Sequence, residues 1–144
     1  MSKEIIRDVK IEVNGVDLSD HLQQIGTPKS ADEQDVTAMG AKNKETLLGI
    51  GDGEITATFF QDYDDGSVDA VLAPLQGENE PFEVLVTPKS GVISKNNPAR
   101  RIKEAILPSI NAVSGAVNAV SMIDAVFKNA GQGGVERLTD PSEV

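Results

Sequence analysis

Apolar and polar residues alternate in several short segments of the chain, and this two-residue period is typical of half-buried β-strands. In the first segment, residues 5–13, four apolar side chains share one face: Ile5, Val9, Ile11 and Val13. Asn14-Gly15 follows directly, and this dipeptide accepts the positive φ angles of a two-residue hairpin turn. The pattern therefore predicts a β-hairpin with a return strand from residue 16, then a bend at residues 19–21 and a strand at residues 22–25.

The clearest strand is predicted at residues 53–61, which are rich in β-branched and aromatic residues. Its two faces carry different side chains: Ile55, Ala57 and Phe59 on one, and Thr56, Thr58 and Phe60 on the other. Residues 80–88 alternate in the same way up to a proline. Two more extended segments, residues 99–107 and 119–127, flank a glycine-containing link and complete the predicted strands.

Helical periodicity occurs in one segment, where apolar residues follow the i, i+3, i+4, i+7 spacing: Val68, Val71, Leu72 and Leu75. Ser67 can cap the start, Gly77 can close the end, and Pro74 should shorten the last turn. We predict one short α-helix at about residues 67–76. Because α/β folds need several crossover helices, the pattern indicates a mainly β fold, an antiparallel β-sandwich or open barrel.

Residues 26–53 show no such pattern, because small, polar and charged residues dominate and apolar residues are isolated. Structureless loops longer than about 15 residues are uncommon in compact domains and usually function or become ordered against a partner. We therefore predict a long assembly loop, with a merely mobile loop as the alternative. The residues expected to form the assembly interface are Asp35, Val36, Thr37, Met39, Leu47 and Leu48.

The length of 144 residues suits one domain, and an apolar fraction of 39% with 25% charged residues is typical of a soluble globular protein. From residue 131 onward the chain is first glycine-rich and then charged. We expect a single β domain over residues 1–130 and a flexible C-terminal tail over residues 131–144.

The net charge of −10, from 13 basic and 23 acidic residues, repels phosphate and anionic lipid. It argues against a DNA ligand or a membrane surface, although a pore lined with carboxylates would let DNA pass without sticking. The first ten residues do not resemble a signal peptide, and no apolar run is long enough to cross a bilayer. Since cysteine is absent, disulfides and thiolate metal sites are excluded.

Candidate catalytic and metal-binding residues are few. The single histidine, His21, has no second histidine or cysteine to complete a metal site or a nucleophile and base pair, so we expect a packing or capping role. Asp62, Asp64 and Gly66 resemble the start of a calcium loop, but the position that needs a glutamate is Ala73. A turn before the helix is the simpler interpretation. We predict no catalytic residue, no metal site and no cofactor, and hence no enzyme.

Three stretches carry a more specific pattern: ADEQDVTAMG at residues 31–40, residues 48–77, and residues 81–98. They resemble the major tail tube proteins of long-tailed (siphovirus-type) bacteriophages, particularly those that infect actinobacteria. The shared motifs are D-V-T-x-x-G at residues 35–40, F-x-Q-D at residues 59–62 and G-S-V-D at residues 66–69. The resemblance covers roughly residues 10 to 130 and leaves the C-terminal segment without a counterpart.

This resemblance implies a β-sandwich with one helix that forms hexameric rings, which stack into a hollow tube that conducts DNA during genome delivery. The surplus of acidic residues predicts that the lumen of such a tube is acidic. It implies that the long loop reaches into neighbouring subunits. The implied partners are copies of the chain and tape-measure, tail terminator and baseplate proteins, and the implied location is the virion tail after assembly in the host cytoplasm.

Two alternatives remain open at this stage. One is the inner tube of a contractile or secretion-type injection system, which shares the general architecture. The other is a monomeric β-sandwich binding module, for instance one that binds carbohydrate. Against the second stand the absence of tryptophan and the single tyrosine, Tyr63, because sugar recognition commonly uses aromatic platforms.

Overall fold

The N-terminal hairpin forms as the sequence predicts, from strands β1 (Lys10–Val13) and β2 (Val16–Asp17). The computed structural model describes residues 8–89 and 91–143, so residues 5–7 of the predicted first strand lie outside the described part. Asn14 and Gly15 adopt φ angles of 51° and 82°, the left-handed conformations that the turn requires. A 3-10 turn (Ser19–His21) then leads into β3 (Leu22–Gly26).

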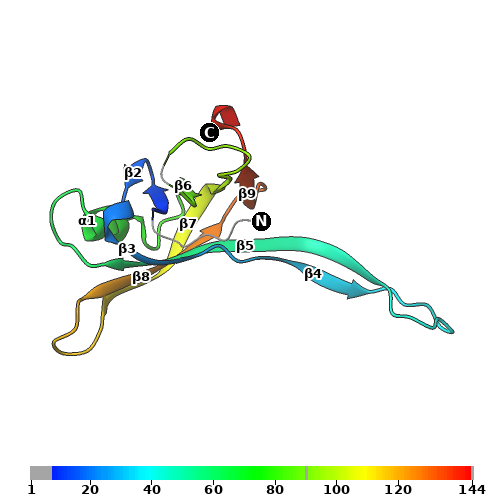
Figure 1. Ribbon diagram of the computed structural model, residues 1–144. Helices are drawn as coiled ribbons and strands as arrows, with labels where there is room; N and C mark the ends of the chain where they lie inside the picture. The colour runs from blue at the N-terminus through cyan, green and yellow to red at the C-terminus, as the bar shows by residue number, and fades with distance from the viewer. Residues whose placement is uncertain (1–7, 90, 144) are drawn as a thin grey trace.

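Every strand pair in the described residues is antiparallel, and the strands form one open sheet in the order β2-β1-β6-β7-β8-β5-β3 (Figure 1). The remaining strands of this path are β5 (Thr46–Phe60), β6 (Phe82–Thr87), β7 (Ala99–Ser114) and β8 (Met122–Asn129). Two further strands lie off it, β4 (Lys29–Asp35) beside β5 and β9 (Val135–Leu138) beside β7. The mainly β, antiparallel and unclosed architecture confirms the predicted fold class.

The predicted helix is short, as Pro74 led us to expect. It comprises α1 (Val68–Leu72) and a following 3-10 turn (Ala73–Leu75) that contains the proline. Ser67 occupies the predicted N-cap position, but its side chain makes no capping hydrogen bond. Its Oγ donates to Asp62 Oδ2 at 2.8 Å instead. A final 3-10 turn spans Pro141–Glu143. Among the described residues, no helix is long and apolar enough to cross a membrane.

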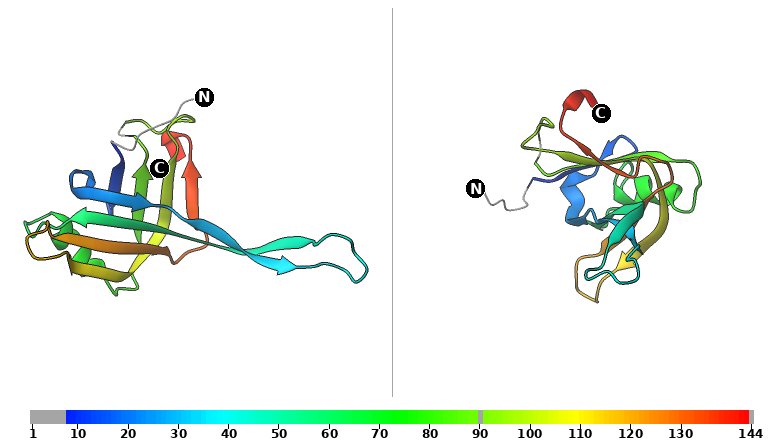
Figure 2. Two further views of the ribbon diagram at one scale, coloured as in Figure 1. Left: turned by 60° about the horizontal axis from the view of Figure 1, so that its bottom comes forward. Right: turned by 90° about the vertical axis from the view of Figure 1, so that its right-hand side faces the viewer.

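The hydrophobic core lies within the curved sheet and is closed on one side by α1, which buries Val68 and Leu72. Figure 2 shows β1 and β6 crossing β3, β5 and β8 at a steep angle, while the long strand β7 bends and pairs with both groups. The rings of Phe82 and Phe127 meet edge to face, with centroids 6.0 Å apart. The largest fully buried side chains are Phe59, Phe127, Ile11, Ile55, Leu72, Ile102, Leu107 and Ile123.

The segment predicted as a long loop is a β-hairpin, and this prediction is therefore corrected. β4 pairs with the first part of β5 from Lys29↔Gly53 to Asp35↔Thr46, so the connection between the strands shortens to residues 36–45. The sequence signal was absent because nearly every side chain of this hairpin is exposed. Alternation marks a strand only where one of its faces is buried.

The predicted C-terminal tail also differs from the structure. Within it, β9 pairs with β7 from Ala99↔Leu138 to Ile102↔Val135. Val135 and Leu138 are both buried, so these residues belong to the sheet and extend the domain beyond residue 130.

Candidate assembly surfaces

The hairpin of β4 and β5 leaves the body of the protein as a long projection (Figures 1 and 2). We call residues 29–53 the arm. The two strands that flank β5 in the body, β8 and β3, end their pairing with it where the arm begins. The last pair with β8 is Glu54↔Lys128, and the last pair with β3 is Gly26↔Thr56. Beyond this point the arm is a two-stranded ribbon, and such ribbons are marginally stable in water on their own.

The structure places the predicted interface residues on the outer part of the arm. Val36 and Met39 lie in the connection, and Leu47 and Leu48 lie on β5, all four with exposed side chains. Adjacent strand residues point to opposite faces, so the two leucines place an apolar side chain on each face of the arm. Ile50, which is not among the predicted interface residues, is also exposed. Apolar exposure of this extent is typical of a surface that another protein covers.

The two polar residues of the predicted interface, Asp35 and Thr37, close the tip of the arm. Asp35 Oδ1 accepts the Thr37 N–H at 2.9 Å, and Thr37 Oγ1 accepts the Glu45 N–H at 2.7 Å. Hydrogen bonding to the Thr37 hydroxyl, and second to the Thr37 N–H, lowers the pKa of the Asp35 carboxyl group. Asp35 and Thr37 therefore shape the turn that presents the exposed apolar residues of the arm.

A second apolar projection is the end of the β7–β8 hairpin. Its exposed large side chains are Val113, Val117 and Val120. Phe60, at the end of β5, pairs with Met122 at the start of β8, so this tip lies at the opposite end of β5 from the arm (Figure 1). The molecule therefore has an apolar projection at each end of one strand.

The acidic turn and the lone histidine meet in one hydrogen-bonded cluster. His21 Nε2 lies 3.0 Å from Asp62 Oδ2, which also accepts the Ser67 hydroxyl, and Asp62 Oδ1 accepts the Asp64 N–H at 3.0 Å. The cluster ties the start of β3 to the turn before α1. Ser67 and His21 both bind the Asp62 carboxylate, so the cluster has a structural role and is not the serine and histidine pair of a nucleophilic enzyme. We call His21, Asp62, Ser67 and the Asp64 N–H the clasp. Within the described residues, no group of three potential metal ligands comes together.

The clasp predicts a pH dependence of stability. The Asp64 N–H, then the Ser67 hydroxyl and then His21, lower the pKa of Asp62 below its ordinary 3.8. A lowered folded-state pKa stabilises the fold above the ordinary value, and this contribution is lost as the pH falls through the folded value. Asp62→Asn should therefore melt below the parent at pH 7, with a difference that shrinks below about pH 4.

Thermal melting followed by circular dichroism between pH 2 and pH 7 measures this effect. Asp65→Asn changes a carboxylate of the same turn that lies outside the clasp, and we expect its melting temperature to follow the parent. A melting difference for Asp62→Asn that stays constant over the whole range would contradict the assigned role of the carboxylate.

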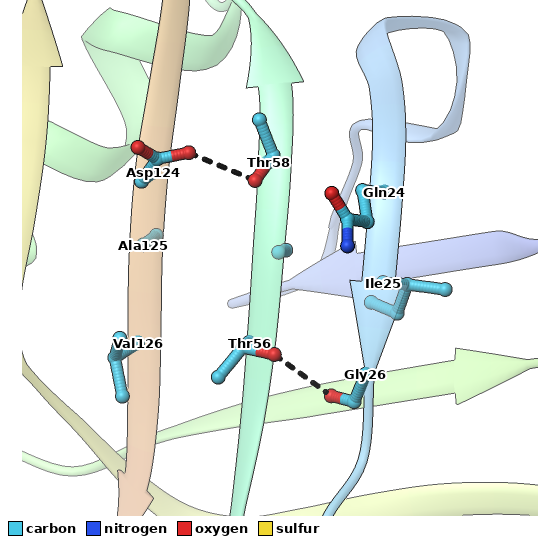
Figure 3. A pocket seen from close by; sticks show the side chains of 9 residues that line it. Gln24, Ile25, Gly26, Thr56, Thr58, Asp124, Ala125 and Val126 are labelled. Atoms are coloured by element: carbon cyan, nitrogen blue, oxygen red, sulfur yellow. Dashed lines mark hydrogen bonds between the residues drawn. The ribbon is translucent and has the colours of Figure 1, made fainter. Parts of the chain in front are cut away.

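A shallow hollow of about 200 Å³ lies on the outer face of the sheet, across β3, β5 and β8 (Figure 3). Its polar groups bind one another: Thr58 Oγ1 donates to Asp124 Oδ1 at 2.8 Å, and Thr56 Oγ1 lies 3.5 Å from the Gly26 carbonyl oxygen. The residues that line it come from paired strands, and two of them, Ala57 and Ala125, are buried. The hollow is therefore a shallow feature of the sheet face that is lined by both polar and apolar side chains.

Comparison with known proteins identifies the class of this fold. No protein family matches the chain, and no curated protein sequence matches it. Solved structures do match, although at low sequence identity, and they match along nearly the whole chain. The chain has the fold shared by tail tube proteins of phage-type particles and tube proteins of contractile injection systems.

Three of these structures define the class. The tail of an empty gene transfer agent particle, which has C6 symmetry, matches with a TM-score of 0.61 and 18% identity over 86% of this chain and 90% of that chain. The SPP1 tail tube matches with a TM-score of 0.69 and 13% identity over 94% and 80%. A chain of the sheath/tube terminator of an extracellular contractile injection system, PVC, matches with a TM-score of 0.70 and 10% identity over 96% and 99%.

Proposed function

We propose that this protein is the structural subunit of a phage tail tube, and that it acts by polymerising into stacked rings without catalysing a reaction. The observation that carries this proposal is the match of nearly the whole chain to tube subunits, in a molecule whose arm exposes apolar side chains on both faces. The sequence motifs at residues 35–40, 59–62 and 66–69 favour a long-tailed phage, of the kind that infects actinobacteria.

The arm provides the contact between subunits in this proposal. A surface that binds a different surface on the next copy generates a ring when the rotation closes. Leu47, Leu48, Val36 and Met39 then lose their exposure to water against neighbouring subunits. The sixfold symmetry of the matched gene transfer agent tail supports six subunits in a ring.

The charge of the chain fits the passage of DNA. With a net charge of −10, a ring of this subunit is strongly acidic, and carboxylates on its inner wall would repel DNA and keep it from sticking. The remaining partners that we propose are tape-measure, tail terminator and baseplate proteins, with assembly in the host cytoplasm and a final place in the virion tail. The match to a chain from a sheath/tube terminator structure supports the terminator contact.

The inner tube of a contractile injection system is the second candidate, because the PVC match has a TM-score comparable with that of the SPP1 tail tube. Contractile systems surround the tube with a sheath, as the name of a matched PVC sheath-tube complex states. Tubes of this protein that bind a sheath protein along their outer wall would favour this candidate.

Electron microscopy and mass measurement of the purified protein test the proposal. We expect rings or tubes of uniform diameter, with ring masses near six times the subunit mass of 15.2 kDa. Dilution should shift the population toward single subunits, because the contacts are non-covalent. A protein that stays monomeric at high concentration and binds a glycan would instead be a binding module.

A further inference from the structure

The base of the arm contacts the C-terminal strand β9. Gly53 is the buried residue at which β5 leaves the body, and a β-carbon at this position would lie 2.7 Å from Val135 Cγ2, closer than carbon atoms pack. Lys29, which pairs with Gly53 across the arm, donates from Nζ to the Val135 carbonyl oxygen at 3.1 Å. Val135 therefore contacts both strands of the arm at its base.

Val135 is itself held firmly by the body. β9 pairs with β7 at four positions, including Ile102↔Val135, and the Val135 side chain lies in the main hydrophobic core. Arg101 Nη2 donates to Glu136 Oε2 at 2.7 Å, next to this contact. Leu138 packs in a second apolar cluster with Leu85, Ile93 and Ala99. β9 is thus a rigid support fixed to the sheet.

The arm base is otherwise weakly constrained by its own sequence. Pro28, between β3 and β4, has no N–H for the ladder, although its carbonyl oxygen accepts the Glu54 N–H at 3.0 Å. Gly51 and Gly53 lack side chains that could pack against the body, and glycine in a strand marks a bend or a close approach of another segment. At Gly53 the close approach is that of Val135.

We propose that β9 is a brace that sets the direction of the arm, and that this brace is required for polymerisation. The inference rests on the proposed function, because it concerns how the arm meets the next subunit. A projection held in its bound direction loses less freedom on association, so rigidity at the base strengthens every contact along the arm. The C-terminal segment, which the family resemblance left without a counterpart, thereby acquires a role as a positioning element.

Two glycine substitutions on the same strand separate the brace from other effects. Neither Gly51 nor Gly53 has a left-handed φ angle, so alanine brings no backbone strain at either. At Gly51 the nearest atom to a new β-carbon is the Ser30 carbonyl oxygen at 3.7 Å, which is an ordinary contact. We expect Gly53→Ala to raise the concentration needed for polymerisation at least about tenfold and Gly51→Ala to change it less than about twofold.

Two further variants keep the test decisive if Gly53→Ala folds poorly. The double variant Gly53→Ala with Val135→Ala removes the clashing methyl group and should recover part of the lost polymerisation. Lys29→Met removes the hydrogen bond to the Val135 carbonyl oxygen without adding volume at the base, and it should weaken polymerisation in the same direction. If the double variant recovers no polymerisation and Lys29→Met does not weaken it, the proposal that β9 braces the arm is wrong.

A distance measurement on dilute, unassembled protein tests the brace without assembly. Because the chain has no cysteine, single cysteines at Asn43 in the arm and Lys103 on β7, both exposed, can carry spin labels. We expect a narrow distance distribution in the parent and in Gly51→Ala, and a shifted or broadened one in Gly53→Ala. Unchanged distances together with unchanged polymerisation of Gly53→Ala would overturn the inference. A parent that never polymerises would contradict the proposed function, while the label distances still decide the role of β9.

Discussion

Replacing residues 32–50 with Asn-Gly is expected to abolish polymerisation and to leave a folded, monomeric body. Ala31 and Gly51 already pair across the arm, and Asn-Gly is the dipeptide that joins β1 to β2 in this chain. None of the removed residues belongs to the hydrophobic core. The truncated protein therefore keeps the packing that stabilises it and loses the exposed apolar residues that we assign to subunit contacts.

Sedimentation velocity at increasing concentration measures this loss, and circular dichroism checks the fold. We expect a single sedimenting species of monomer mass at concentrations where the parent polymerises, with a melting temperature within a few degrees of the unassembled parent. Tubes formed by the truncated protein would show that the contacts between subunits lie elsewhere.

A point substitution with a matched control sharpens the same prediction. Leu48 on the arm and Val92 on the body are exposed to nearly the same extent, 72% and 73%. Leu48→Asp should raise the concentration needed for polymerisation at least about tenfold, equivalent to about 1.4 kcal/mol, since it places a charge in an apolar contact. Val92→Asp should have little effect. Equal effects of the two substitutions would indicate a general influence of charge.

Phe59→Ala is expected to destabilise the body by about 3–5 kcal/mol, the usual range for a buried phenylalanine. Phe59 is fully buried, lies on β5 between Leu22 of β3 and Ile123 of β8, and belongs to the main core. Against a typical domain stability of about 5–15 kcal/mol, this loss should lower the melting temperature by roughly 10 °C or more.

The adjacent residue provides the control for this prediction. Phe60 points to the other face of β5 and is 37% exposed, so Phe60→Ala should cost about 1 kcal/mol or less. Urea unfolding of the monomeric body gives both values on one scale. Similar losses for the two variants would contradict the assignment of the core to the Phe59 face.

The fold was predictable where the determining interactions are local. The Asn14-Gly15 turn requires positive φ angles that few dipeptides accept, and the alternation around Phe59 reflects one buried face. β4, with the sequence KSADEQD, has no buried face, so its pairing with β5 left no mark in the pattern of polar and apolar residues. β9 is four residues long, and its place is set by residues of β7 that lie more than 30 residues earlier than their partners.

The candidate site was predictable only in part, for a related reason. Isolated apolar residues in a polar segment indicated exposure of Val36, Met39, Leu47 and Leu48, and the structure exposes all four. Their arrangement on a ribbon follows from backbone pairing that side-chain patterns do not report. The contact between Gly53 and Val135 was hidden, because it depends on the meeting of two segments that are distant in the sequence.

β9 follows the arm in the sequence and is therefore synthesised after it. Lys29 and Val135, which meet at the arm base, are 106 residues apart in the sequence. At about 5–20 residues per second, translation separates the synthesis of Lys29 from that of Val135 by roughly 5 to 20 seconds. During this interval a nascent chain lacks the brace that we propose, so copies held close together on polyribosomes would associate weakly.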